Sequence, residues 1–276
     1  MHKSFGLMQG RLTPSPKGKI QFFPVKNWTK EFSNLKALSL NRIEWTLDQK
    51  GLMKNPIMSK KGQKKINQLC KKHNVKIDSI TGDCFMQKPF WKYQGYKKKK
   101  LISQLRKIIT YASKLKIKYL VFPVVDNGKI ENPEQEKILI EELKNLTQYL
   151  KINKVQILFE TDMKPKAYLT FISNFKKKYF GINYDIGNSA SNNFDPKEEF
   201  KYYGSRIKNI HIKDREKYGK TVPLGEGNAN FKMIARLCKK INYKGNYILQ
   251  AARKKNENEI KTIESYLKFL NYNFCK

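Results

Sequence analysis

The sequence predicts an α/β fold, a (β/α)8 barrel that forms one domain over residues 1–276, and three observations support this prediction. Eight short apolar runs begin 25 to 43 residues apart, which is the spacing of repeated strand–helix units. Segments with helical periodicity separate them, and no linker or low-complexity stretch divides the chain. A doubly wound sheet is the alternative, but Gly6 and Gly10 do not form a dinucleotide-binding G-x-G-x-x-G pattern, and no P-loop motif occurs. The closed barrel is therefore favoured.

The apolar runs predict eight buried parallel strands, because strands covered by helices on one face and packed in a barrel on the other are apolar throughout. The predicted strands are residues 5–8, 42–45, 76–80, 119–124, 156–159, 181–184, 207–212 and 247–249.

Between these strands, apolar residues recur every three or four positions, which predicts amphipathic helices with one face towards the sheet. The clearest of these faces lie within residues 28–38, 101–115, 138–150, 231–241 and 260–270. The third is preceded by Asn132, Pro133 and Gln135, which predict an N-cap, a first-turn proline and a capping-box partner. His73 ends a lysine-rich segment before the third strand, where an imidazole complements a helix C-terminus.

Polar residues follow the predicted strands at the end where a barrel of this type places its active site. Glu160, Asp185 and His211 stand at the ends of the fifth, sixth and seventh strands, inside otherwise apolar sequence. Two carboxylates and one imidazole on neighbouring strands form a suitable ligand set for Mn²⁺, Mg²⁺, Co²⁺ or Zn²⁺. The sequence therefore predicts a divalent-metal site on this rim.

The net charge of +34 suggests a polyanion partner at first sight, but only seven of the 57 basic residues are arginine. The lysines are spread over almost every predicted helix, alongside many Asn, Ile, Tyr and Phe residues, which share A/T-rich codons with lysine. This pattern is typical of solvated helix faces under a coding bias, and nucleic-acid binding is not expected. Four scattered cysteines, no signal peptide and no run of about 18 apolar residues lead us to expect a cytoplasmic protein without a membrane segment.

Several motifs together resemble the sugar phosphate isomerase/epimerase family, which includes hexulose-phosphate, xylulose-phosphate and tagatose/psicose 3-epimerases. They are GLMQGRL at 6–12, FETD at 159–162, YDIGNS at 184–189, HIKD at 211–214 and VPLGEGNANF at 222–231. The resemblance covers essentially the whole barrel and is more specific for fold and metal site than for substrate.

The resemblance implies one divalent metal held by a Glu, an Asp, a His and a final Glu on the last four strands. Glu160, Asp185 and His211 match the first three ligands, and two glutamates of such enzymes move a proton through an enediolate. The fourth position holds Gln250. An amide oxygen can still bind a hard cation, but an amide cannot accept and return a proton near neutral pH.

This departure leaves three hypotheses open. Glu44 or Glu226 could supply the missing acid beside Glu160 in an epimerase or isomerase. The reaction could instead need one base only, as in an isomerisation or an inosose-dehydratase-like elimination. Alternatively, the protein could be a non-catalytic barrel that binds a sugar.

Four further residues are candidate contacts of a sugar or sugar phosphate. They are Arg11, Asn188, Lys213 and Arg253, which follow the first, sixth, seventh and eighth strands. Guanidinium groups bind carboxylate or phosphate in a bidentate manner. A DNA-repair enzyme similar to endonuclease IV would need a histidine-rich three-zinc cluster, which a chain with three histidines cannot build. The resemblance also implies a homo-oligomer as an open expectation.

Overall fold

The computed structural model describes residues 5–16, 21–254 and 257–274. Eight parallel strands form the centre of the fold. They are β1 (Phe5–Met8), β2 (Arg42–Thr46), β3 (Lys76–Thr81), β4 (Tyr119–Val124), β5 (Gln156–Thr161), β6 (Phe180–Asp185), β7 (Ile207–Ile212) and β10 (Asn246–Leu249). They close into a barrel in the order β1-β10-β7-β6-β5-β4-β3-β2, and β10 pairs with β1 to complete the ring. The predicted (β/α)8 barrel is confirmed.

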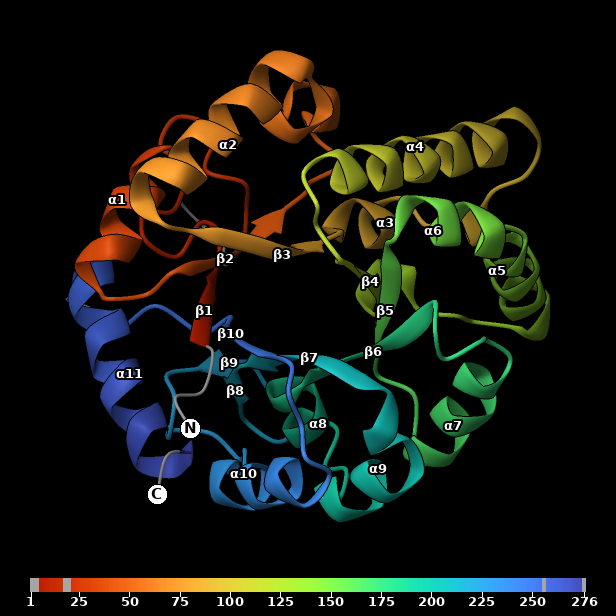
Figure 1. The fold of residues 1–276 in the computed structure, drawn as a ribbon. Coiled ribbons are helices and arrows are strands. Elements are labelled where there is room, and N and C mark those ends of the chain that lie inside the picture. The colour runs from red at the N-terminus through yellow and green to blue at the C-terminus, as the bar shows by residue number, and fades with distance from the viewer. Residues whose placement is uncertain (1–4, 17–20, 255–256, 275–276) are drawn as a thin grey trace.

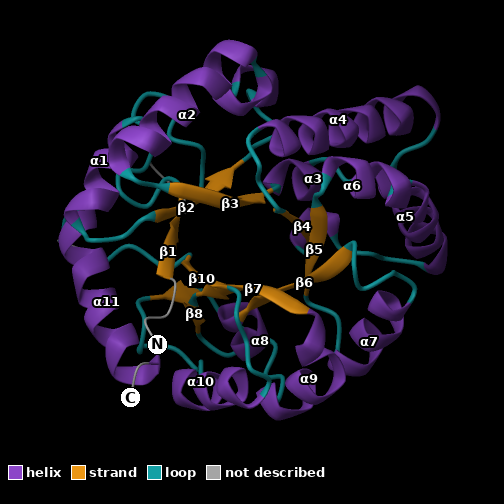
Figure 2. Cartoon of the chain, viewed as in Figure 1, coloured by secondary structure: helices purple, strands orange, loops and turns teal. Residues whose placement is uncertain are grey.

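Helices surround this ring on the outside, as Figure 2 shows. The longer ones are α1 (Lys30–Ala37), α2 (Lys60–His73), α4 (Gly95–Lys114), α5 (Pro133–Asn145), α7 (Pro165–Ser173), α9 (Pro196–Tyr203), α10 (Phe231–Lys240) and α11 (Glu259–Phe274). Shorter helices are α3 (Asp83–Gln87), α6 (Thr147–Asn153) and α8 (Ile186–Ser191). Among the described residues, no helix is both long and apolar enough to cross a membrane.

The predicted elements correspond closely to the observed ones. All eight predicted runs are strands, and three of them (β1, β4 and β7) have the predicted bounds. The helix expected over 138–150 is divided into α5 and α6 at the buried Leu146, which caps the first and begins the second. The side chain of Asn132 accepts a hydrogen bond from the Gln135 amide, as the capping motif predicts.

The strand that carries Glu160 is held by aromatic packing on its helix-facing side. Phe159 is fully buried, and its ring lies 5.1 Å from that of Phe171, 5.0 Å from that of Phe175 and 6.0 Å from that of Phe180. Because side chains alternate along a strand, this packing directs the neighbouring Glu160 to the opposite side. The core thus fixes the direction of a candidate metal ligand.

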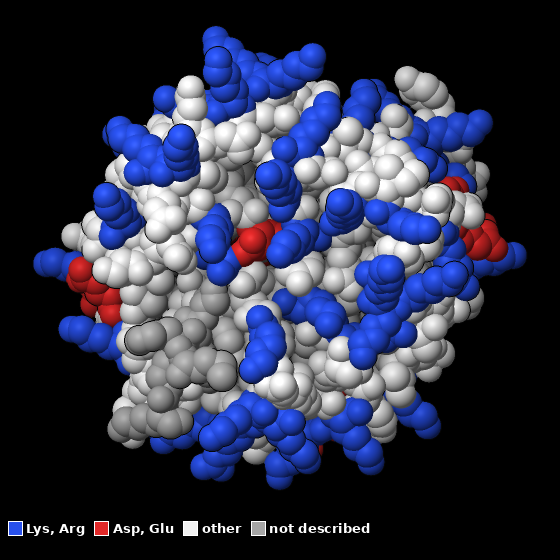
Figure 3. Space-filling model, viewed as in Figure 1, with Lys and Arg blue, Asp and Glu red and all other residues white. Residues whose placement is uncertain are grey.

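The loops after β6 and β7 contain short elements that the sequence did not predict. Helix α8 follows β6 directly, and an antiparallel pair, β8 (Asp214–Arg215) with β9 (Thr221–Val222), follows β7. In Figure 1 these elements lie behind the barrel. The figure therefore shows the barrel from its opposite end, where the strands begin. Figure 3 shows lysine and arginine side chains spread over that whole face, without being confined to one groove.

Candidate metal centre

Three side chains from consecutive strands meet at the carboxyl end of the barrel. Glu160 lies on β5, Asp185 ends β6, and His211 lies on β7, where it pairs directly with Asp185 in the strand register. All three are buried, and one potential ligand atom from each lies within 4.8 Å of the others. Since two ligands at about 2.0–2.2 Å from one ion are at most about 4.4 Å apart, a shift of a few tenths of an ångström would let them share a cation.

The imidazole of His211 has a carboxylate on each side. Its Nδ1 lies 3.1 Å from Oε2 of Glu160 and 3.9 Å from Oδ2 of Asp185, so this nitrogen faces the candidate metal position. Its Nε2 lies 2.6 Å from Oε1 of Glu44 on β2. Burial lowers the pKa of His211, but the Glu44 and Glu160 carboxylates outweigh this effect and raise it to about 10.

Glu44 is fully buried beneath His211, and the described residues that line the cavity above do not include it. Its second oxygen, Oε2, accepts hydrogen bonds from Ser79 Oγ at 2.7 Å and Asn209 Nδ2 at 2.9 Å. A carboxylate bound to the outer nitrogen of a ligand histidine fixes the orientation of the ring and raises its basicity. The sequence suggested that Glu44 acts as an acid or base. Its position instead fits a residue that orients the imidazole of His211.

Amide groups orient the other two ligands. Asn183 Nδ2 donates to Oε2 of Glu160 at 2.7 Å, and Asn188 Nδ2 donates to its Oε1 at 3.0 Å. The Asn188 backbone amide donates to Oδ1 of Asp185, whose Oδ2 forms an ion pair with Lys213 Nζ at 2.7 Å. Asn188 and Lys213, which the sequence suggested as substrate contacts, therefore lie directly beside the candidate metal ligands.

Gln250 follows β10 and is the fourth candidate ligand. Its Nε2 donates to Oε1 of Gln21 at 2.7 Å, and its own Oε1 is buried without a hydrogen-bond partner among the described residues. A buried acceptor without a partner is costly unless a ligand or water completes it. This oxygen fits a hard divalent cation, so the residues present suit the metal that the sequence predicts.

A cavity of about 460 Å³ lies over these groups. Its charged lining residues among those described are Asp83, Asp126, Glu160, Asp162, Lys213 and Arg215, and Asn188, Gln21 and Gln250 are among its uncharged ones. Acidic side chains outnumber basic ones in this lining by four to two, although the whole chain carries a net charge of +34. This local excess of negative charge favours a cation at the site.

Three other residues suggested by the sequence, Arg11, Arg253 and Glu226, are not among the described residues that line this cavity. Arg253 donates to the backbone oxygens of Gly10 and Thr13 and pairs with Glu259 at 2.9 Å. Arg11 is buried, and burial together with Arg253 lowers its pKa to about 10. None of the described cavity-lining residues is Arg11 or Arg253, and both belong to the packing around the loop after β1.

Glu226 is exposed in the turn that precedes α10. The buried Asp214 holds this turn by accepting hydrogen bonds from the backbone amides of Gly225, Gly227 and Ala229 at 2.9–3.0 Å. A Cβ atom on Gly227 would lie 2.3 Å from Oδ1 of Asp214, which explains the glycine. The glycine-rich motif thus forms an anchored turn, and Glu226 is not among the described residues that line the cavity.

Sequence reasoning missed several polar residues of the site, and simple signals identify three of them. Asp83 follows the third strand by two residues and could have been found at the same rim as the metal ligands. Asn183 and Asn209 precede Asp185 and His211 by two positions, so strand alternation places each pair on one face. Gln21 lies in a long loop, where no such periodicity applies.

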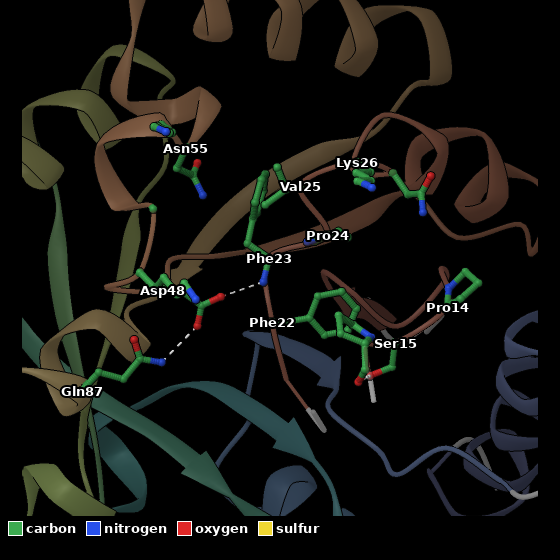
Figure 4. Close-up of a pocket in the computed structure, with 15 residues that line it drawn as sticks. Pro14, Ser15, Phe22, Phe23, Pro24, Val25, Lys26, Asp48, Asn55 and Gln87 are labelled. Atoms are coloured by element: carbon green, nitrogen blue, oxygen red, sulfur yellow. Dashed lines mark hydrogen bonds between the residues drawn. The ribbon is translucent and has the colours of Figure 1, made fainter. Parts of the chain in front are cut away.

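A second cavity, of about 850 Å³, lies beside the first, and Gln87 lines both. Figure 4 shows two of its aromatic lining residues, Phe22 and Phe23, and Asp48 between Phe23 and Gln87. The Asp48 carboxylate accepts hydrogen bonds from the Phe23 amide at 2.8 Å and from Gln87 Nε2 at 3.0 Å. Asp48 therefore anchors the loop segment that also carries Gln21 into the cavity above the metal ligands.

Comparison with known families gives a match over most of the chain. The model of the xylose isomerase-like TIM barrel family matches residues 32–271. A protein of Haemophilus influenzae provisionally named L-ribulose-5-phosphate 3-epimerase is 28% identical over 116 residues. That alignment spans 37% of this chain and 41% of the relative, so the chain matches about two fifths of that protein's length.

Solved structures share the fold over nearly the full chain. The D-psicose 3-epimerase of Clostridium cellulolyticum, solved with D-tagatose, superposes with a TM-score of 0.75 at 10% identity and covers 98% of this chain and 99% of its own. A xylose isomerase-like TIM barrel protein of Mycobacterium smegmatis, solved in complex with magnesium, has a TM-score of 0.68 at 16% identity and covers 99% and 100%.

Proposed function

Because the chain belongs to the xylose isomerase-like TIM barrel family, we propose that it is a divalent-metal-dependent epimerase of ketose phosphates that inverts a carbon next to the carbonyl. The observation that carries this proposal is the set of Glu160, Asp185 and His211 together with the unpartnered oxygen of Gln250. Four oxygen and nitrogen ligands around one position leave coordination sites for substrate.

In the proposed reaction, these four residues would hold the cation, and Glu160 acts as the base. When bound, the cation stabilises the negative charge that develops on the sugar oxygens. Glu160 removes the proton from the carbon next to the carbonyl, and the amides of Asn183 and Asn188 keep its carboxylate in one orientation. Lys213 balances the charge of Asp185, and Glu44 keeps Nδ1 of His211 directed at the position that the metal would occupy.

A phosphorylated ketose is the favoured substrate class. The H. influenzae relative is named for a ketose 5-phosphate, and Lys213 and Arg215 contribute positive charge to the cavity. Lys213 and Asn188 are the proposed substrate contacts, with Arg215 oriented by its hydrogen bond to Asn188 Oδ1. A reaction on such a metabolite would take place in the cytoplasm.

The proposal is tested with L-ribulose 5-phosphate as substrate and protein loaded with Mn²⁺, Mg²⁺, Co²⁺ or Zn²⁺ in turn. We expect conversion to the 3-epimer that is lost on chelation and in Asp185→Asn. Turnover that survives chelation would contradict the proposal. Metal binding without turnover of any ketose, phosphorylated or not, would favour the binding-only barrel. Loss of water from an inosose would favour the dehydratase.

A further inference from the structure

Epimerisation by two groups requires a second proton carrier, and the residue after β10 that would supply it is an amide. We infer that Asp83 is the second proton-transfer group of this site, an inference that rests on the proposed function. Asp83 is 5% exposed and lines the same cavity as Glu160 and Gln250. Asp83 begins α3 directly after β3, and Glu160 lies on β5, so the two carboxyl groups reach the cavity from separate strands of the rim with β4 between them.

The backbone before Asp83 fixes its position. The amide of Gly82 donates to the Val121 oxygen on β4 at 3.0 Å, which ties the turn after β3 to the barrel. A Cβ atom on Gly82 would lie 2.4 Å from the Phe85 ring and 3.0 Å from the Val121 oxygen, so only glycine fits this turn without displacement. Asp83 therefore occupies a rigid position at the strand end, as a catalytic group requires.

A chain of two amides connects the cation position to Asp83. Gln250 Nε2 donates to Oε1 of Gln21 at 2.7 Å, and Gln21 Nε2 donates to Oδ2 of Asp83. Because its Nε2 is used in this chain, the Oε1 of Gln250 remains buried without a partner among the described residues. Gln21 reaches only Oδ2 of Asp83, and the described residues provide no hydrogen bond to Oδ1. The glutamine after β10 would thus offer its oxygen to the cation, while its amide nitrogen orients Asp83 through Gln21.

The surroundings of Asp83 suit a group that exchanges protons near neutral pH. Burial raises its pKa to about 7; the hydrogen bond from Gln21 opposes this rise, and the Asp48 and Glu160 charges add to it. A carboxyl group with a pKa near the working pH can both donate and accept a proton efficiently. The inference rests on the position of Asp83 in the cavity, and its raised pKa agrees with that position.

In the inferred step, Glu160 removes the proton from one face of the carbon, and the electron pair of the broken C–H bond enters the enediolate. The protonated carboxyl of Asp83 then donates its proton to the other face, where a new C–H bond forms. The product leaves Glu160 protonated and Asp83 ionised, and exchange of protons with solvent restores both. No oxidant or reductant is needed.

The test follows L-ribulose 5-phosphate in deuterium oxide with metal-loaded wild type, Asp83→Asn and the control Glu134→Gln. Glu134 is exposed in the first turn of α5 and does not line the cavity, so its variant removes a carboxylate without touching the site. We expect Asp83→Asn to bind metal normally and to incorporate deuterium into recovered substrate within tenfold of wild type. Its epimerisation should fall by at least 100-fold, while Glu134→Gln stays within threefold of wild type.

A double variant, Asp83→Asn with Gln250→Glu, returns an acid to the end of β10 and is expected to recover at least tenfold of the lost epimerisation. The inference is overturned if Asp83→Asn epimerises within threefold of wild type, or if exchange and inversion fall together. If the wild type neither incorporates deuterium into any ketose phosphate nor inverts its carbon, the proposed function is rejected as well. The behaviour of the wild type therefore distinguishes failure of the proposed function from failure of the role of Asp83.

Discussion

The imidazole Nε2 of His211 lies 2.6 Å from Oε1 of Glu44, and both side chains are fully buried inside the barrel. The other imidazole nitrogen faces Glu160 and Asp185. A contact between a carboxylate and the outer nitrogen of a ligand histidine sets the direction of the ring and its affinity for metal. The strand β2, which contributes no ligand of the predicted triad, thereby contributes to the candidate metal centre.

Glu44→Gln is expected to weaken metal binding by about 10- to 100-fold, because the neutral amide no longer supports the basicity of His211. Titration of metal-free protein with Mn²⁺ or Zn²⁺ measures this change. The matched control is Ser79→Ala, which removes one hydrogen bond to Glu44 and keeps the carboxylate. Equal affinities of Glu44→Gln and wild type would show that Glu44 does not support the imidazole.

The stability of the protein is expected to depend on pH through Glu31. Burial raises the pKa of Glu31 to about 7, against hydrogen bonds from the Gly10 and Leu12 amides that lower it. Between pH 4.5 and 7 the folded state therefore keeps a proton that the unfolded state has lost, so stability falls as the pH rises through this window. The shift corresponds to about 3 kcal/mol in the free energy of unfolding.

Urea unfolding at pH 5 and pH 7 measures this dependence. Glu31→Gln should show a smaller fall between the two values, with the remainder arising from the other groups whose pKa is raised, among them Asp83, Glu199 and His211. The exposed Glu134→Gln serves as a control and should leave the profile of the wild type unchanged. An identical fall in Glu31→Gln and wild type would contradict the assignment.

Asp48→Ala is expected to loosen the loop beside the cavity, because it removes the acceptor of the Phe23 amide and of Gln87 Nε2. Loss of hydrogen bonds to a charged group costs about 1.5–3 kcal/mol, and we expect the free energy of local opening of this loop to fall by that amount. Amide hydrogen exchange at Phe23 should become faster, while exchange in the strand β5 stays unchanged. Unaltered protection at Phe23 would argue against the anchoring role.

Phe159→Ala is expected to lower the free energy of unfolding by about 3–5 kcal/mol, because a fully buried ring among other aromatic rings leaves a cavity. Denaturant unfolding measures the loss, and Phe159→Leu, which keeps more of the volume, should lose less. A loss below 1 kcal/mol in the alanine variant would mean that the helix-facing packing of β5 does not hold this strand.

Local sequence patterns predict the barrel well because each strand and helix has its own periodicity. The predicted strand over 119–124 matches β4, since both its faces are buried and its ends border polar turns. The split between α5 and α6 at Leu146 was missed because the apolar spacing continues across it. The short α8 and the β8–β9 pair have too few residues for any periodicity to identify them.

The site was predictable where a residue's position in a strand determines its direction. Glu160, Asp185 and His211 meet because neighbouring parallel strands end at one rim. The partners of Gln250 could not be read from the chain, since Gln21 is 229 residues away and belongs to a loop. Likewise, the guanidinium of Arg253 reaches the backbone after β1, a contact that depends on how the barrel closes.

The most direct test of the account is the metal content of the purified protein and of His211→Ala, measured by elemental analysis after equilibration with a mixture of Mn²⁺, Mg²⁺, Co²⁺ and Zn²⁺. The account predicts about one equivalent of divalent metal in the wild type and loss of this metal in His211→Ala, with both proteins folded by circular dichroism. Equal metal content in the two proteins, or none in the wild type, would contradict a metal centre built on Glu160, Asp185 and His211.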